Sequence, residues 1–244
     1  MRILGYAGLL CVLTVGLFAQ SAAANPRTAS LDPLDIAGDS LYANELAESD
    51  LLLMLNKTLA LETAAPAGQK RQYRIAQALI FRAQFHQQRQ RPKDAENDLD
   101  QAEKMVLAGG EPSDAWGLQV LADIRSRLMG FRGLGYIIAN SGSINDLALK
   151  SLQLDPSNVV SAIIVAYGKI KAPGLFGGNP ELGIQMLTNV IARPDIQPTY
   201  RFYALLGVAE GWKKQNDPAQ RQRTLESARL IYPANPDLQK ALKE

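Results

Sequence analysis

SLQLDPSNVV, residues 151–160, stops one helix and starts another within a few residues. The apolar helical pattern ends before Pro156, because proline disfavours helix in the residue that precedes it, and apolar residues resume after Asn158. Similar stops occur at Pro194 and Pro233, so these three prolines lie 38 and 39 residues apart. A period of this size predicts an array of helical hairpins, in which each hairpin buries its apolar face against its neighbours.

The chain between these stops has the pattern of an all-α protein. From about Leu31 onward, apolar residues recur at spacings of three and four, and no alternating run is long enough for a strand. The glycine-rich segment 132–143 has no clear pattern. We expect helices over residues 40–62, 69–91, 92–108, 113–131, 144–154, 159–171, 181–192, 199–215, 219–232 and 236–243.

The first 24 residues have the layout of a secretory signal peptide. Arg2 precedes an apolar run from Ile3 to Phe18, and small residues follow up to Ala24, after which we expect cleavage. The alternative is an uncleaved anchor, but a spanning helix needs about 20 apolar residues and this run is shorter. Residues 25–39 are predicted to be a loose leader, and residues 40–244 to form the folded domain.

Cysteine and charge content exclude several classes of function. Cys11 is the only cysteine of the 244 residues, and Leu10 before it does not fit a lipoprotein signal. A chain cleaved after Ala24 therefore has no disulfide, thiolate metal site or cysteine nucleophile. The formal net charge is only +2, without the basic surplus that nucleic-acid binding requires.

The repeat boundaries resemble the tetratricopeptide repeat family, whose second helix ends in a pattern like A-L-x-L-D-P-x-N. Residues 151–158 and 228–235 follow this pattern, and Leu206-Gly207 matches the leucine and small residue of the closest helix crossing. Ala166 and Ala83 fall at the same position in their own units. The resemblance covers residues 69–243. It implies a right-handed superhelical array of about four hairpins, with an N-terminal helix and a C-terminal capping helix.

The repeat period exceeds the family's 34 residues, and the excess falls in the loop APGLFGGNP, residues 172–180. This loop looks like one found in a set of predicted bacterial exported proteins with degenerate repeats. The resemblance also implies a concave groove lined by first-helix residues, which would suit an extended peptide. The groove residues are Gln77, Gln84, Gln87, Gln88, Tyr167, Lys171, Arg201 and Trp212.

Three motifs have a catalytic or ligand-binding interpretation beside a structural one. Glycines of the loop 172–180 could cradle a phosphate, but no strand precedes them, and a turn that presents Leu175 and Phe176 to a neighbour or partner fits better. His86, the only histidine, is expected to be packed or solvated rather than a metal ligand. The carboxylates Asp94, Glu96, Asp98 and Asp100 are expected to form a solvated acidic face. The scattered aromatic and methionine residues are expected to pack in the core.

The sequence therefore predicts an exported, non-catalytic scaffold of the periplasm or cell envelope. It would bind a protein or peptide in its groove, without a cofactor, metal or nucleic acid, and without stable membrane insertion after cleavage. One alternative is a small-ligand adaptor with an internal pore or pocket, because some exported proteins with such repeats are associated with substrate-binding proteins of transporters. The other is a hydrolase or lyase with a carboxylate site inside the superhelix.

Overall fold

The computed structural model describes residues 32–244, and this part of the chain contains eleven α-helices, one 3₁₀ turn and no strand. The predicted signal peptide and cleavage site lie outside the described residues. None of the described helices is both long and apolar enough to cross a membrane. The elements are α1 (Pro33–Ala43), α2 (Glu48–Ala64), α3 (Gln69–Gln88), α4 (Pro92–Leu107), α5 (Ala115–Leu128), α6 (Gly133–Leu154), α7 (Val159–Lys171), η1 (Gly174–Phe176), α8 (Pro180–Ile191), α9 (Pro198–Lys214), α10 (Pro218–Arg229) and α11 (Pro236–Ala241).

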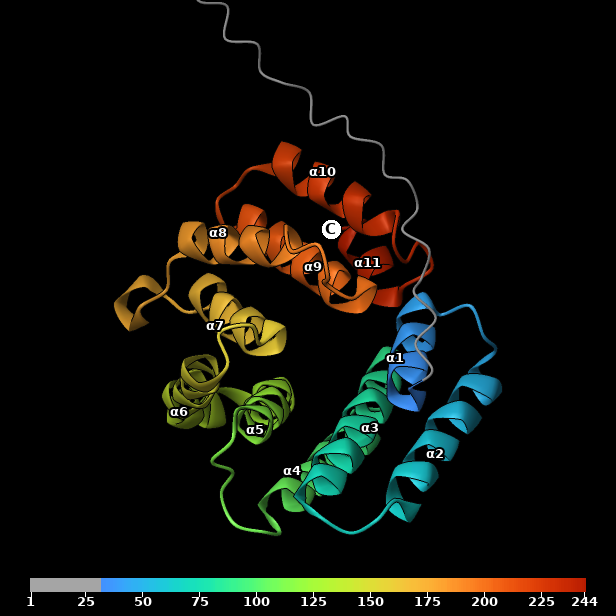
Figure 1. Cartoon of the computed structure of the whole chain (residues 1–244). Coiled ribbons are helices and arrows are strands. Elements are labelled where there is room, and N and C mark those ends of the chain that lie inside the picture. Colours follow the sequence, from blue (N-terminus) through green and yellow to red (C-terminus); the bar gives the residue numbers. More distant parts are fainter. Residues whose placement is uncertain (1–31) are drawn as a thin grey trace, which may run out of the picture.

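The predictions of an all-α fold and of paired helices are confirmed. Consecutive helices pack as the hairpins α3/α4, α5/α6, α7/α8 and α9/α10, with α1 and α2 before them and α11 after them (Figure 1). Side chains at the predicted boundaries cap the helices, as expected for Asn and Asp at the N-cap. Asn158 accepts a hydrogen bond from the backbone N–H of Ser161 at 3.0 Å, and Asn179 accepts one from Leu182 at 3.0 Å.

Four predicted helix boundaries are wrong. The first helix does not run from Ser40 to residue 62, because Asn44 adopts a left-handed conformation (φ 53°) that separates α1 from α2. Helix α1 begins at Pro33, so residues 33–39 are helical rather than a loose leader. Asp114, not Ser113, caps α5. Helix α6 begins at residue 133 and continues through its glycines, instead of starting at residue 144.

Close backbone approach holds the C-terminal hairpins together. A Cβ atom built on Gly207 would lie 2.6 Å from Leu187 Cδ1 and 2.8 Å from the ring of Tyr167. At Gly183 it would lie 2.5 Å from Ile170 Cγ1. Only glycine lets the helices approach this closely, which agrees with the expectation that Gly207 marks a tight crossing.

The first helices of the hairpins form a closed ring with α1. Neighbouring pairs among α3, α5, α7 and α9 are in contact, and α1 contacts both α3 and α9. Figure 1 shows these five helices around a common centre, with α2, α4, α6, α8 and α10 outside them. We call the five inner helices the inner wall. The array therefore has no open end between its first and last hairpins, and its handedness and family membership stay predictions.

The seam of the ring is the contact between α1 and the C-terminal elements, and it joins residues 190 or more positions apart in the sequence. Asn235 Nδ2 donates to the Tyr42 carbonyl at 2.9 Å, and Asn44 Nδ2 donates to the Ala234 carbonyl at 3.1 Å. Tyr42 also packs edge-on against Phe202 of α9, with ring centroids 6.0 Å apart. One buried and one exposed asparagine amide that bond backbone carbonyls, together with an aromatic contact, therefore fix α1 against the C-terminal elements.

Candidate functional site

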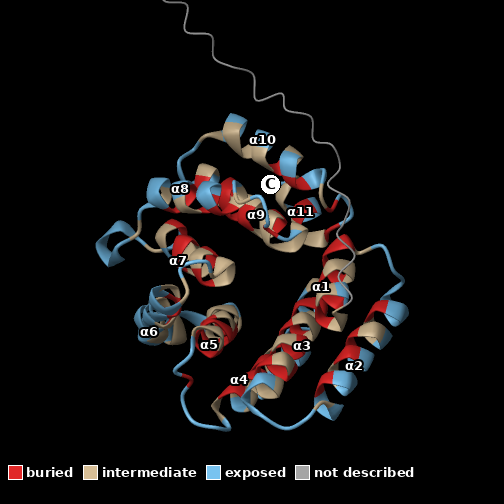
Figure 2. Ribbon diagram, in the orientation of Figure 1, coloured by how far each residue is buried: buried red, intermediate tan, exposed pale blue. Residues whose placement is uncertain are grey.

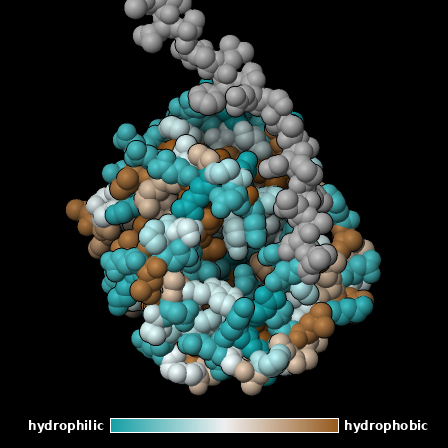
Figure 3. All heavy atoms as spheres, in the orientation of Figure 1, coloured by the Kyte–Doolittle hydropathy of each residue, from teal (hydrophilic) through white to brown (hydrophobic). Residues whose placement is uncertain are grey.

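A small cavity lies within the ring and has a volume of about 50 Å³. Side chains from all five inner helices line it, and Figure 3 shows a recess near the centre of this face. Its lining combines aliphatic side chains with tyrosines and one ion pair. The lining residues used below are Tyr42, Ile80, Val120, Asp123, Arg127, Ile163, Tyr200 and Tyr203. We call this space the lumen cavity.

Arg127, in the last turn of α5, is the cation of the lumen cavity. Its Nε donates to Asp123 one turn earlier at 2.8 Å, and its Nη1 donates to Gln84 Oε1 of α3 at 2.7 Å. Burial lowers the Arg127 pKa, but the attraction of Asp123 and of nearby tyrosines outweighs this effect and raises the pKa overall. Arg127 therefore stays charged, with its orientation fixed by two partners.

Several donors in this cavity have no hydrogen-bond partner among residues 32–244. They are the hydroxyl groups of Tyr42, Tyr200 and Tyr203 and the Nη2 nitrogen of Arg127. Burial raises the pKa of all three tyrosines, to about 12 for Tyr200. Their hydroxyls thus remain protonated at neutral pH and can donate to an acceptor in the cavity.

The lumen cavity can bind a group that carries acceptor oxygens next to an apolar body. The Arg127–Asp123 pair has no net charge, so the donors favour a carbonyl or a single carboxylate rather than a multiply charged anion. Ile80, Val120 and Ile163 provide the apolar surface. Asp123 is the one carboxylate among the described lining residues, so acid–base work by two carboxyl groups, as in the hydrolase alternative, has no second group here.

The glutamines predicted for the groove lie in different surroundings. Gln77 lines the lumen cavity. Gln84 is buried, and it bonds both Arg127 and Asp237, the latter at 3.1 Å. Gln88 also donates to Asp237, at 3.4 Å, while its Oε1 is buried without a partner among the described residues. Gln87 is exposed. Two of the four therefore support the C-terminal segment rather than present free amides.

The other four groove residues are spread over the C-terminal hairpins. Tyr167 stacks on Tyr203, with ring centroids 5.4 Å apart, and donates to the Tyr203 carbonyl at 3.2 Å. Lys171 is exposed and lies over the Tyr167 ring at 5.6 Å. Arg201 donates to the Arg193 carbonyl beyond the end of α8. Trp212 is half-buried beside a separate depression. The eight residues do not line one continuous cavity, and their role in binding stays a prediction.

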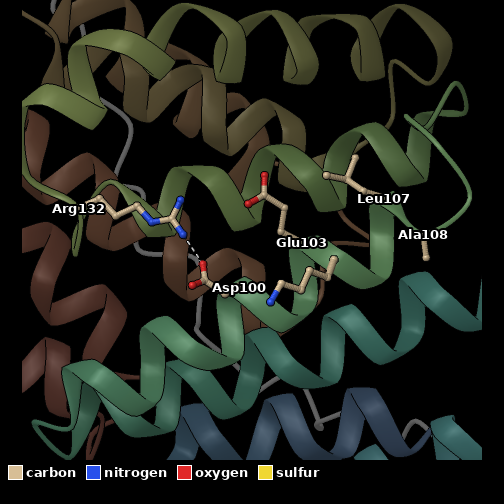
Figure 4. A pocket seen from close by; sticks show the side chains of 6 residues that line it. Asp100, Glu103, Leu107, Ala108 and Arg132 are labelled. Atoms are coloured by element: carbon tan, nitrogen blue, oxygen red, sulfur yellow. Dashed lines mark hydrogen bonds and ion pairs between the residues drawn. The ribbon is translucent and has the colours of Figure 1, made fainter.

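A larger depression on the outside of the ring is an ion-paired surface. It has a volume of about 420 Å³, and Figure 4 shows Arg132 pointing toward Asp100 across it. Arg132 also pairs with Glu96 at 3.4 Å, and Glu103 pairs with Arg125 at 2.7 Å. These charged groups already have partners, so this depression is a weaker candidate than the lumen cavity.

Of the predicted acidic face, Asp98 alone is buried, in a packed cluster with His86 and Arg82, whereas Asp94 is exposed and Glu96 and Asp100 are partly exposed. Asp98 is buried and accepts two hydrogen bonds from Arg82, so the prediction of a solvated carboxylate is wrong for this residue. His86 Nε2 lies 3.7 Å from Asp98, and its ring packs edge-on against Phe85. The described residues contain no group of three side chains suited to a metal ion.

Apart from Gln77, the residues predicted for the groove do not line the lumen cavity, and sequence reasoning missed its tyrosines and Arg127. Tyr42 lies in α1, outside the predicted repeats, and Arg127 lies in the unit whose pattern the glycines obscure. Tyr203 was assigned to the core, yet it faces both the core and the cavity. The family spacing of groove positions gave no signal for these residues, because it describes an array that does not close.

No model of a known protein family matches the chain. A search of curated proteins also finds no match. The resemblance to tetratricopeptide repeats therefore rests on the sequence pattern and on the helical pairs.

Proposed function

We propose that this chain is a non-catalytic, helical-repeat binding protein that holds a compact ligand inside its ring. The observation that carries the proposal is the convergence of unpaired donors on the lumen cavity: three tyrosine hydroxyls and one nitrogen of Arg127. These groups keep contact with solvent, because none of them is among the buried polar atoms without a partner in the described residues. A ligand with acceptor oxygens can accept hydrogen bonds from all of them at once in place of water.

Size and chemistry narrow the ligand class. A cavity of about 50 Å³ has room for roughly three to five water-sized groups, which is too little for an extended peptide. The lining fits a small molecule with one carboxylate or carbonyl near Arg127 and a short apolar part against Ile163. With the expected signal peptide, this proposal corresponds to the small-ligand adaptor, exported and associated with a transport system.

Acetate and propionate, with four and five heavy atoms, are suitable probes for this site. Binding to the protein purified after expression of the full chain is measured by calorimetry, and native mass spectrometry shows whether a ligand is carried through purification. The double variant Tyr200→Phe, Tyr203→Phe removes two hydroxyls and keeps both rings. At about 1 kcal/mol for each lost hydrogen bond, we expect affinity to fall roughly 30-fold.

The matched control is Tyr136→Phe, because Tyr136 lies on α6 outside the lumen cavity and should leave affinity unchanged. A protein that carries no ligand and binds none of the probes would contradict the proposal. Equal affinity of the double variant and the native protein would place the binding site elsewhere.

A second candidate is the protein-binding scaffold, favoured by the depression beside Trp212. This depression has a volume of about 530 Å³ and is lined by Glu181, Ile184, Trp212 and Gln215. An open site with an aromatic wall and a carboxylate suits a basic side chain of a partner segment. Cross-linking in an envelope extract tests this candidate: a partner lost with Trp212→Ala but kept with Gln87→Ala supports it, and one kept with both contradicts it.

A further inference from the structure

The loop between α7 and α8 is a rigid structure rather than a flexible linker. Its backbone hydrogen bonds include Asn179 N–H to the Lys169 carbonyl at 2.7 Å and Gly178 N–H to the Pro173 carbonyl at 3.1 Å. Gly177 has a φ of 80°, and a Cβ on Gly178 would lie 1.8 Å from the Ala172 carbonyl oxygen. The loop conformation therefore depends on these two glycines.

This rigid loop holds two large apolar side chains in solvent. Leu175 is 97% exposed and Phe176 is 79% exposed. Figure 2 shows η1 as an exposed projection, and brown side chains project at the corresponding edge of Figure 3. Because Leu175 and Phe176 contribute little to the core, hydrophobic burial within this chain does not explain their presence.

Helix α6 carries two further exposed apolar side chains beyond the end of α7. Ser161, near the start of α7, donates to Ser151 of α6 at 2.9 Å. Gly168, near the end of α7, lies beside Asn145, which comes earlier in α6 than Ser151. The two helices therefore run antiparallel, and the first turns of α6 continue past the end of α7. Leu134 and Ile138 in these turns are about as exposed as Phe176.

The charges on the last turn of α7 and in the loop are positive, and the exposed Glu181 follows only in the first turn of α8. The sequence has no carboxylate between Asp155 and Glu181, whereas Lys169 and Lys171 lie within this stretch. Residues 133–145 of α6 carry no charge at all. Projecting apolar side chains beside lysines complement an apolar layer beneath anionic groups.

We propose that this edge docks the protein on an anionic lipid surface, with Leu175 and Phe176 inserted among the acyl chains and Lys171 at the headgroups. The convex shape favours a bilayer over a protein partner, because fluid lipid accepts a projection without a preformed pocket. The rigid loop pre-orders both side chains, so that insertion costs little conformational entropy. This docking is independent of any ligand in the lumen cavity.

Vesicle co-sedimentation tests the proposal with the protein purified after expression of the full chain. We expect binding to vesicles of phosphatidylglycerol and phosphatidylcholine, with weaker binding to phosphatidylcholine alone and at high salt. Removing one buried Leu or Phe side chain weakens partitioning about tenfold to hundredfold. The single variants Leu175→Ala and Phe176→Ala should each show a loss in this range, and the double variant a larger one.

Leu230→Ala is the matched control, because Leu230 is also highly exposed but lies at the end of α10. Thermal unfolding should be the same for all variants, since none of these side chains is buried. Unchanged vesicle binding in the double variant would overturn the proposal, as would binding that does not distinguish anionic from neutral vesicles. Loss of self-association or of a protein complex in the double variant, without vesicle binding, would overturn it in favour of a protein partner.

Discussion

The two halves of the ring are held together by different forces. Between α1 and α6, arginines bridge neighbouring helices: Arg74 pairs with Asp32 and Glu62, Arg82 with Asp98, and Arg125 with Glu103. From α7 onward, the described ion pairs lie near the C-terminus and involve mostly exposed groups. At the helix crossings of this half, glycines allow close approach and aromatic rings pack against each other. The N-terminal half should therefore respond to changes of charge more than the C-terminal half does. Both halves should respond to added volume, because a Cβ on Gly117 of α5 would lie 2.3 Å from the Tyr73 hydroxyl.

The largest expected effect is the loss of the Arg74 ion pairs. Arg74 Nε lies 2.6 Å from Glu62 Oε2, and the Glu62 side chain is only 6% exposed. Arg74→Met leaves this carboxylate buried without its cation, which should lower the free energy of unfolding by about 3 kcal/mol. Urea unfolding measures the change. Arg229→Met is the control, because its pair with Glu226 is exposed and should contribute little.

Acid should reproduce part of this effect in the native chain. Hydrogen bonds from Arg74 hold the pKa of Asp32 below its ordinary value of 3.8. The contribution of Asp32 is therefore present above that value and is lost as the pH falls through the lower pKa of the folded state. An Arg74→Met chain that lost stability as steeply as the native chain in this range would contradict the assignment.

In the C-terminal half, added volume should have the next largest effect. A Cβ on Gly183 meets both Ile170 and the Ala166 carbonyl, at 2.5 and 2.8 Å, so Gly183→Ala should destabilise the fold by about 1–3 kcal/mol. Gly142→Ala is the matched control, because this helical glycine has nothing within 4 Å. At Gly142 the better helix propensity of alanine should raise the free energy of unfolding by up to about 1 kcal/mol. Chemical unfolding measures both variants. A change in the free energy of unfolding with the same sign for Gly183→Ala and Gly142→Ala would contradict this prediction.

The smallest expected effect is the titration of His86. Burial lowers its pKa, and this outweighs the attraction of Asp98 and Asp94, which Arg82 and Arg91 partly oppose. The unfolded chain therefore binds a proton at His86 more readily than the folded chain does. The folded state loses no stability to this titration above the ordinary histidine pKa of about 6.5, and its free energy of unfolding falls at lower pH. His86→Gln should give a shallower decline in the unfolding midpoint between about pH 7 and pH 5. An identical slope would exclude this contribution.

The hairpins could be predicted from sequence because their boundaries are local. Proline stops such as Pro156, and an Asn such as Asn158 before the next helix, act within one turn of the chain. The break at Asn44 was missed because a left-handed Asn has no strong local pattern. Helix α6 was predicted too short because packing against α5 and α7 outweighs the weak helix propensity of its glycines.

The lumen cavity could not be predicted because it depends on the curvature of the whole array. Tyr42, Arg127 and Tyr200 belong to three helices that are far apart in sequence, and they meet only because the ring closes. No local spacing encodes this meeting. The exposed pair Leu175 and Phe176, by contrast, was predicted from its glycine-rich loop, because the loop conformation is set by residues next to it.

The seam between α1 and the C-terminal elements has a consequence for biosynthesis. An open helical array can fold hairpin by hairpin as it leaves the ribosome, because each unit needs only its neighbours. Here Tyr42 obtains its partner only when Asn235 has been synthesised, and closing so long a stretch of chain is entropically costly and slow. An emerging chain must therefore pass through an open form. In this form α2 and α3 already cover Leu41, but the face of α1 around Tyr42 stays uncovered until α9 and the residues around Asn235 have been made.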